Sequence, residues 1–173
     1  MLSTDQKGTI AEMAIAFAAA KLCLPVYAPV SQGTRCDLII EVGKKLFGVQ
    51  CKWAVRRGDV VMIRCRTCRR SRTGLVHRSY TVDEIDLIAG YCVELDQCYA
   101  VPFADYFRRG AIHLRVAPTK NNQQQGILWA RDFEFERLHW AGPGAIAQLG
   151  ERQRGTLEVA GSSPAGSTLF PGP

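Results

Sequence analysis

The sequence Leu46-Phe-Gly-Val-Gln-Cys-Lys-Trp53 is an apolar run that contains two polar side chains, Gln50 and Lys52. A run of this kind after the turn residues Gly43-Lys-Lys45 predicts a β-strand over Lys45–Trp53. Because successive side chains of a strand point to opposite faces, Gln50 and Lys52 share one face. Taken alone, the pair is also compatible with the exposed face of an edge strand.

The preceding segment, Arg35–Val42, predicts a second strand that is joined to the first by the hairpin turn at residues 43–45. Asp37 lies near its start, where strand propensity does not explain an aspartate. Two interpretations stay open: the carboxylate caps a backbone N–H in a turn, or it serves chemistry. Across a tight hairpin, a carboxylate, an amide and the Lys52 ammonium would meet in one small volume.

A helix is predicted from the capping residues at positions 3–5 through about Leu22, ahead of Pro25. Glu12 lies inside its apolar segment Ile10–Phe17. A buried and unpaired carboxylate is costly. Glu12 therefore either faces solvent, as isolated charges usually do, or has a specific partner.

The rest of the first 140 residues reads as further strands with one short helix. Strands are predicted at Val26–Val30, Val60–Arg66, Leu87–Val93, Cys98–Phe103 and Ala111–Val116. A turn-rich basic segment is predicted up to about Ser79, and a short helix capped by Thr81-x-x-Glu84 is predicted after it. Helix, hairpin and further strands in this order predict an α/β fold, with a central mixed β-sheet flanked by helices.

The composition favours a polyanionic partner. The 173 residues carry a formal net charge of +6, with a pI of about 9.1.

No apolar run is long enough for a membrane helix, and no signal peptide is recognisable, so no membrane partner is expected. Seven cysteines, most of them in apolar runs, indicate reduced thiols and a cytoplasmic protein.

The positive charge is concentrated after Lys52. Between Lys52 and Arg78 there are nine basic residues and one acid, Asp59. We expect contacts with the polyanionic partner, which the family resemblance given below implies is DNA, from Gln32, Arg35, Arg56, Arg57, Arg64, Arg66, Arg69, Arg70 and Arg72. The alternative is a solvated basic loop without a partner.

The order Asp37, hairpin, Gln50-Cys51-Lys52 resembles the core motif of the PD-(D/E)XK nucleases. In that family a preceding helix usually carries a glutamate, as Glu12 would here. The phrase Gly33-Thr-Arg-Cys-Asp-Leu38 resembles the motif of the resolvase-like and homing-endonuclease branches. The stretches Tyr80–Tyr91 and Cys98–Pro102 resemble the second half of those homing endonucleases, so the resemblance covers roughly residues 3–138. It implies a restriction-endonuclease-like core.

Two positions depart from the family pattern. Cys36 replaces the proline of the family name, and Gln50 replaces the usual acid. An amide oxygen ligates Mg²⁺ without charge, so metal affinity should fall and Glu12 should matter more. A glutamine here is typical of a homing-endonuclease branch associated with group I introns in bacterial tRNA genes.

The resemblance implies an endonuclease that hydrolyses phosphodiester bonds in double-stranded DNA with Mg²⁺ or Mn²⁺. The implied catalytic residues are Glu12, Asp37, Gln50 and Lys52, and the implied metal ligands are Glu12, Asp37, Gln50 and the Cys51 backbone carbonyl. Since one site cuts one strand, a homo-oligomer is expected, a dimer or a tetramer. The alternatives are a Holliday-junction resolvase or repair nuclease, and a DNA-binding protein whose nuclease site has decayed.

The last 33 residues differ from the rest in composition. Residues 1–140 are predicted to form the endonuclease domain and residues 141–173 a disordered tail, since 11 of those 33 are Gly or Pro. Ala147-Gln-Leu-Gly-Glu-Arg152 and Gly161-Ser-Ser-Pro-Ala165 resemble the translated D-arm and T-arm of a tRNA gene. We infer that the reading frame runs into such a gene.

Overall fold

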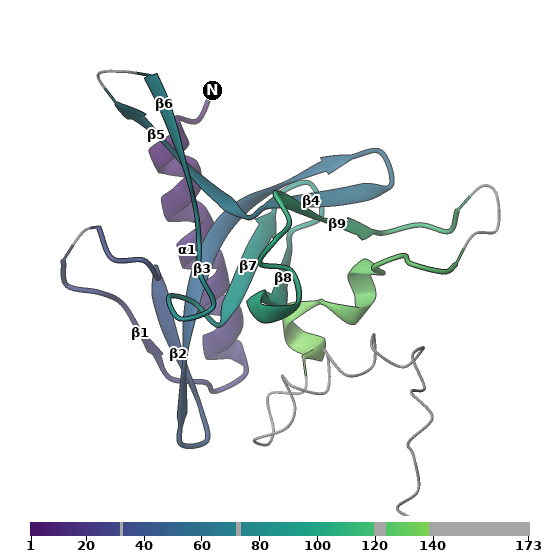
Figure 1. Cartoon of the computed structure of the whole chain (residues 1–173). Helices are drawn as coiled ribbons and strands as arrows, with labels where there is room; N and C mark the ends of the chain where they lie inside the picture. The colour runs from purple at the N-terminus through teal and green to yellow at the C-terminus, as the bar shows by residue number, and fades with distance from the viewer. Residues whose placement is uncertain (32, 72–73, 120–123, 139–173) are drawn as a thin grey trace, which may run out of the picture.

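The computed structural model describes residues 1–31, 33–71, 74–119 and 124–138 (Figure 1). The predicted tail over residues 141–173, with its tRNA-like segments, lies outside the described residues. Gln32 and Arg72, two of the expected DNA contacts, also lie outside them. In the described part of the chain, no helix is long and apolar enough to cross a membrane.

Helix α1 (Thr4–Lys21) begins where its capping residues predict. The Ser3 hydroxyl accepts a hydrogen bond from the Gln6 backbone N–H at 3.2 Å, and the Gln6 side chain accepts one from the Ser3 N–H at 2.8 Å. This reciprocal pair satisfies two backbone donors that a helix start otherwise leaves open. The buried side of α1 carries Ala11, Ile15, Ala18 and Ala19.

Seven strands form one mixed sheet, which confirms the predicted fold class. They are β1 (Val26–Tyr27), β2 (Leu38–Val42), β3 (Lys45–Arg57), β4 (Val60–Arg64), β7 (Leu87–Cys92), β8 (Gln97–Pro102) and β9 (Ala111–Arg115). The long strand β3 pairs antiparallel with β2 and β4 and parallel with β7. Strand β8 pairs antiparallel with β7, and β9 pairs antiparallel with β4. The short 3₁₀ helices are η1 (Phe103–Asp105), η2 (Ala130–Asp132) and η3 (Phe135–Arg137).

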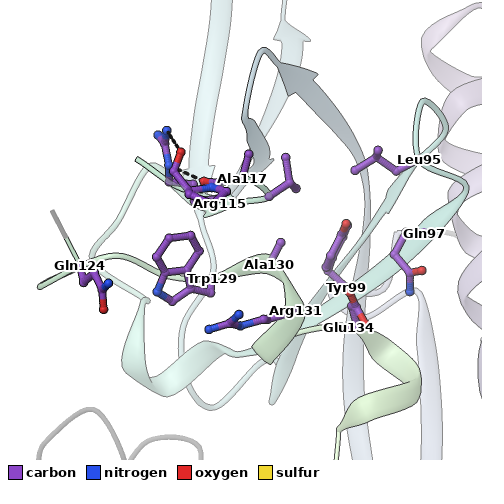
Figure 2. A pocket seen from close by; sticks show the side chains of 12 residues that line it. Leu95, Gln97, Tyr99, Arg115, Ala117, Gln124, Trp129, Ala130, Arg131 and Glu134 are labelled. Carbon is purple, nitrogen blue, oxygen red and sulfur yellow. Dashed lines mark hydrogen bonds between the residues drawn. The ribbon is translucent and has the colours of Figure 1, made fainter. Parts of the chain in front are cut away.

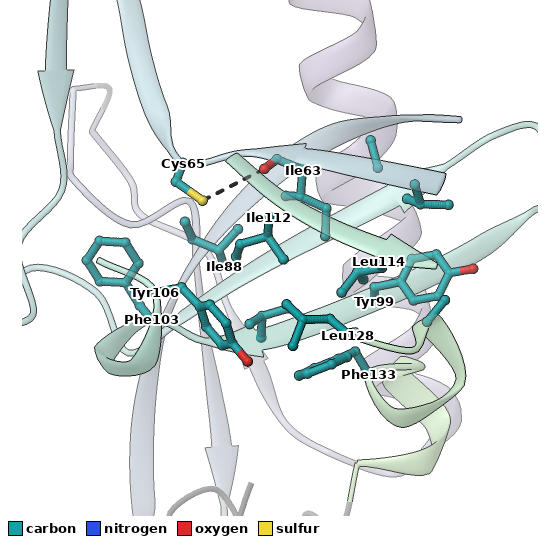
Figure 3. Packing of buried hydrophobic residues seen from close by; sticks show 14 of the residues in the cluster. Ile63, Cys65, Ile88, Tyr99, Phe103, Tyr106, Ile112, Leu114, Leu128 and Phe133 are labelled. Atoms are coloured by element: carbon teal, nitrogen blue, oxygen red, sulfur yellow. Dashed lines mark hydrogen bonds between the residues drawn. The ribbon is translucent and has the colours of Figure 1, made fainter. Parts of the chain in front are cut away.

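Strand β3 lies between two hydrophobic clusters. Val49 and Cys51 belong to the cluster that α1 covers, whereas Ala54 belongs to the cluster on the other face. Figure 3 shows the second cluster, in which β4 and β9 place Ile63 and Ile112 against Ile88 of β7. By alternation along β3, Gln50 and Lys52 therefore point to the face away from α1.

Two predicted strands are shorter than expected. The strand predicted over Val26–Val30 extends only from Val26 to Tyr27, since Pro29 has no N–H to donate to a ladder. Strand β2 begins at Leu38 rather than at Arg35. Just before it, the Cys51 N–H donates to the Asp37 carboxylate, at 2.8 Å, instead of to a backbone carbonyl.

The basic segment predicted as turn-rich is a β-hairpin. Strands β5 (Arg66–Ser71) and β6 (Gly74–Ser79) pair antiparallel as a separate two-stranded sheet, which projects from the body in Figure 1. The strand predicted over Val60–Arg66 accordingly ends at Arg64. The polar composition hid this ribbon, because a two-stranded ribbon needs no alternating apolar face.

The short helix predicted at Thr81 is a turn in the structure. The expected capping contact is present, since the Thr81 N–H donates to the Glu84 carboxylate at 3.0 Å. No helix follows, because Glu84 is held by Arg35 and the chain enters β7 at Leu87.

Candidate active site

Asp37 lies opposite Gln50, because Leu38 of β2 pairs with Val49 of β3. The Asp37 carboxylate accepts hydrogen bonds from the Gln50 amide nitrogen and, at 2.8 Å, from the Cys51 N–H. Burial raises the pKa of the Asp37 carboxyl, while the Cys51 N–H, Lys52 and Gln50 lower it. The Asp37 carboxylate therefore caps a backbone N–H, and its role in chemistry stays a prediction.

Gln50 is the one buried polar or charged residue among those that the structure describes, at 7% exposure. Its strand is not an edge strand, since Val49 pairs with Leu38 on β2 and with Leu87 on β7. The amide nitrogen also lies 3.5 Å from the Cys51 carbonyl oxygen. Two oxygen acceptors, one from Asp37 and one from Cys51, thus converge on the end of the Gln50 side chain.

Lys52 extends from the same face of β3 as Gln50. Its ammonium donates to the Tyr80 hydroxyl at 2.7 Å and lies 5.0 Å from the centre of the Tyr80 ring. Burial lowers the pKa of Lys52, and the Asp37 carboxylate opposes that effect. The Asp37 carboxylate and the Gln50 amide are thus in contact, and the Lys52 ammonium lies within electrostatic range of Asp37.

Glu12, on α1, lies within electrostatic range of this group. It is half-buried, whereas Met13 and Phe17 on the same helix are 68% and 65% exposed. Burial raises the pKa of the Glu12 carboxyl, the Asp37 carboxylate raises it further, and Lys52 lowers it. Glu12 is thus within electrostatic reach of Asp37 and Lys52 and does not simply face solvent.

The residue that the sequence did not single out for this site is Tyr80. It is 3% exposed, and two cations lie near its ring: the Lys52 ammonium at 5.0 Å and the Arg35 guanidinium carbon at 4.6 Å from the ring centre. Nothing in the local pattern around Tyr80 connects it with Lys52, which is 28 positions away.

Arg35, expected at the DNA, is brought beside the site but is already engaged. Its guanidinium makes two 2.9 Å contacts with the two carboxylate oxygens of Glu84 and donates to the Ser79 carbonyl at 2.9 Å. Arg78 reaches the same carboxylate at 3.0 Å. Arg35 therefore has partners within the protein, the Ser79 carbonyl and the Glu84 carboxylate.

The other expected DNA contacts lie at two hairpins. Arg56 and Arg57 are exposed at the turn between β3 and β4; Arg64 and Arg66 are exposed on either side of the buried Cys65; Arg69 and Arg70 lie on β5. Arg57 and Arg64 are separated by the length of β4, roughly 13 Å to 20 Å at the rise of a strand. The structure therefore does not gather these arginines into one tight cluster.

The oxygen atoms around Asp37 could hold a divalent cation only if carbonyl and amide oxygens are counted together with the carboxylates. Among the described residues, no group of three or more His, Cys, Asp or Glu side chains could hold a metal ion. However, the Asp37 carboxylate and the Cys51 carbonyl both face the hydrogen-bond donor of Gln50, as they would face a cation. With Glu12 and the Gln50 amide oxygen, the set consists of hard oxygen donors, which suit Mg²⁺ or Mn²⁺.

A separate cleft of about 520 Å³ lies at the end of the sheet near η2 (Figure 2). Its lining includes Tyr99, Arg115, Trp129 and Arg131, and none of the four catalytic candidates. This cleft is therefore distinct from the group around Asp37.

The model of the PD-(D/E)XK endonuclease family matches residues 2–136 of the chain. The chain belongs to this family. PD-(D/E)XK nucleases generally use divalent metal ions. The predicted resemblance and the predicted restriction-endonuclease-like core are confirmed by this match and by the structural comparison that follows.

A solved structure described as that of a bacterial homing endonuclease, I-Ssp6803I, is similar to this PD-(D/E)XK chain. The two superpose with a TM-score of 0.67 and 25% sequence identity, over 90% of this chain and 100% of that one. Comparison with curated protein sequences gave no match.

Proposed function

We propose that this chain is a homing endonuclease that hydrolyses phosphodiester bonds in double-stranded DNA with Mg²⁺ or Mn²⁺. The observation that carries the proposal is the convergence of Asp37, Gln50 and the Cys51 carbonyl, with the Lys52 ammonium within electrostatic range of the Asp37 carboxylate. The family match and the similar homing endonuclease support it.

Each residue of the site has a role that its chemistry suggests. Asp37, Glu12, Gln50 and the Cys51 carbonyl would hold the metal ion, which would polarise the phosphate and lower the pKa of a bound water. The Lys52 ammonium would stabilise charge that develops on the phosphate oxygens, or orient the attacking water. Because Gln50 contributes no charge, Glu12 would supply the second negative charge of the ligand set.

The duplex would be held by the arginines of the two hairpins. Their charge supports phosphate binding, which contributes affinity without sequence information. One such site cuts one strand, so we propose a homo-oligomer, a dimer or a tetramer, for cutting both strands. The described cysteines are free thiols, which supports work in the cytoplasm.

The homing role rests on two features of the sequence. Gln50 stands where the related tRNA-intron branch has glutamine, and residues 147–165 read like a translated tRNA gene. We therefore propose an uninterrupted tRNA gene of the kind that the tail resembles as the target DNA.

The test uses the full chain with supercoiled plasmids that carry or lack such a gene, in Mg²⁺ and in EDTA. We expect linear product only from the plasmid with the gene, and only with the metal. Cutting of a four-way junction irrespective of sequence would favour a resolvase instead. Binding of DNA with no cutting of any substrate would favour a decayed nuclease site.

A further inference from the structure

The Lys52 ammonium sits at the end of a flexible four-carbon chain, so its position in the site has to be held by other groups. The Tyr80 hydroxyl accepts a hydrogen bond from it at 2.7 Å, and the Tyr80 ring lies 5.0 Å from the ammonium. An ammonium has three hydrogen-bond donors. One contact with Tyr80 therefore leaves donors for a phosphate or a water.

Tyr80 is itself fixed by two neighbours. The Tyr80 ring meets the Phe103 ring edge-on, with the ring centres 6.3 Å apart, in the second hydrophobic cluster. Tyr80 is 3% exposed. The Arg35 guanidinium carbon also lies over the Tyr80 ring, 4.6 Å from its centre. A tyrosine clamped in this way is a rigid partner for a flexible lysine.

Arg35 is fixed in turn by an acid. Glu84 contacts the guanidinium through both carboxylate oxygens, at 2.9 Å each. Glu84 also accepts the Thr81 N–H at 3.0 Å, which ties the pair to the chain directly after Tyr80. The contacts thus run without a break from Glu84 through Arg35 and Tyr80 to Lys52.

We propose that Tyr80 is a positioning residue for the nuclease reaction: its hydroxyl holds the Lys52 ammonium beside Asp37, and the Arg35–Glu84 pair holds the Tyr80 ring. This inference rests on the proposed nuclease function. Burial raises the pKa of Tyr80, so the phenol keeps its proton and remains a neutral acceptor for the ammonium.

The first test separates positioning from packing. Tyr80→Phe keeps the ring, and with it the contacts to Phe103 and Arg35, and removes only the hydroxyl. Tyr99→Phe is the matched control, because Tyr99 is also 3% exposed and belongs to the same cluster. The assay is single-turnover cleavage of the tRNA-gene plasmid with Mg²⁺, together with DNA affinity in Ca²⁺.

We expect Tyr80→Phe to slow the cleavage step by about 10-fold to 100-fold, because a misplaced catalytic group costs rate. DNA affinity should stay within about two-fold, since the effect lies after binding, and Tyr99→Phe should cut like the wild type. Equal cleavage rates for Tyr80→Phe and the wild type would overturn the role of Tyr80 while leaving the proposed function in place. A wild-type chain that cuts nothing would overturn both.

The second test reads the contact without cleavage. In ¹⁵N-labelled protein, the side-chain ammonium of a hydrogen-bonded lysine exchanges slowly enough for its N–H signal to be observed. The Lys52 signal is identified by its absence from Lys52→Arg. We expect this signal to be lost or displaced in Tyr80→Phe and retained in Tyr99→Phe. An unchanged Lys52 signal in Tyr80→Phe would mean that the hydroxyl does not hold the lysine.

Discussion

Just beyond the β2–β3 ladder, the Asp37 carboxylate accepts the backbone N–H of Cys51 at 2.8 Å, while the Asp37 N–H donates to the Val49 carbonyl at 2.9 Å. It sets the carboxylate against β3 at the point where the Gln50 side chain and the Cys51 carbonyl are available. Asp37, the residue just before β2, is therefore bonded to β3 through both its backbone and its side chain, and it is also the central residue of the proposed site.

The charge of Asp37 can be separated from its capping role. Asp37→Asn keeps an oxygen that can accept the Cys51 N–H but removes the negative charge. We expect cleavage to fall by about 100-fold or more, since an electrostatic group at the reacting phosphate is lost, while DNA binding persists. Gel-based cleavage and fluorescence anisotropy measure the two effects. Asp105→Asn, an exposed position in η1, is the control, and full cutting by Asp37→Asn would contradict the assignment.

Gln50→Glu should be less stable than the wild type without metal and should bind the metal ion more tightly. Without metal, the glutamate cannot donate to Asp37, and two carboxylates then face each other in a buried place. We expect a loss of about 1 to 3 kcal/mol in the free energy of unfolding in EDTA. Excess Mn²⁺ should raise the Tm of Gln50→Glu more than that of the wild type. Equal Mn²⁺ shifts for the two proteins would argue against Gln50 as a ligand.

The ion pair of Arg35 with Glu84 predicts a pH-dependent contribution to stability. The hydrogen bond from Arg35 is the main reason why the pKa of Glu84 is lowered from its ordinary value of 4.5. A lowered pKa in the folded state means that the stabilisation is complete above the unfolded pKa and is lost as pH falls through the folded one.

Glu84→Gln should therefore be less stable than the wild type at neutral pH, and the difference should shrink as pH falls below 4.5. Urea unfolding across this range measures it. Asp83→Asn, its exposed neighbour, should show no such convergence. A gap between Glu84→Gln and the wild type that stayed constant from neutral to acidic pH would rule out the ion pair as its cause.

Gly90 is required by the packing of β4 against β7. A Cβ atom at this position would lie 2.8 Å from two side-chain carbons of Ile63 and 3.3 Å from the Ala54 Cβ. We expect Gly90→Ala to destabilise the fold by about 1 to 3 kcal/mol, the usual cost of overpacking a core. Adding Ile63→Val should recover part of the loss. Gly48→Ala, where the nearest atoms are 3.7 Å away, is the tolerated control in thermal unfolding.

The exposed arginines should differ from Arg35 in how they affect DNA binding. Replacing Arg64 or Arg66 by Gln should weaken binding at all sequences and reduce the salt slope by about one unit per phosphate contact. Arg35→Gln should lower the Tm instead, because Arg35 is engaged with Glu84. Affinity measured across a salt series checks this, and unchanged slopes for Arg64→Gln and Arg66→Gln would place the DNA elsewhere.

The sequence alone determined the helix start, the β2–β3 hairpin and the shared face of Gln50 and Lys52. Each of these depends on short-range rules: a capping pair three residues apart, a tight turn, and the two-residue alternation of a strand. The same rules offered a capping role for Asp37 but did not identify the Cys51 N–H on β3 as its partner. Nor could they foresee that a polar, arginine-rich segment would pair as β5 and β6.

Only the tertiary structure decided which groups surround Lys52. Tyr80 meets Lys52 from 28 positions away, and Arg35 meets Glu84 from 49 positions away. These contacts form because the sheet and its second hydrophobic cluster bring distant loops together, and burial then makes an unpaired charge costly. The partly buried Arg35 pairs with Glu84 for that physical reason.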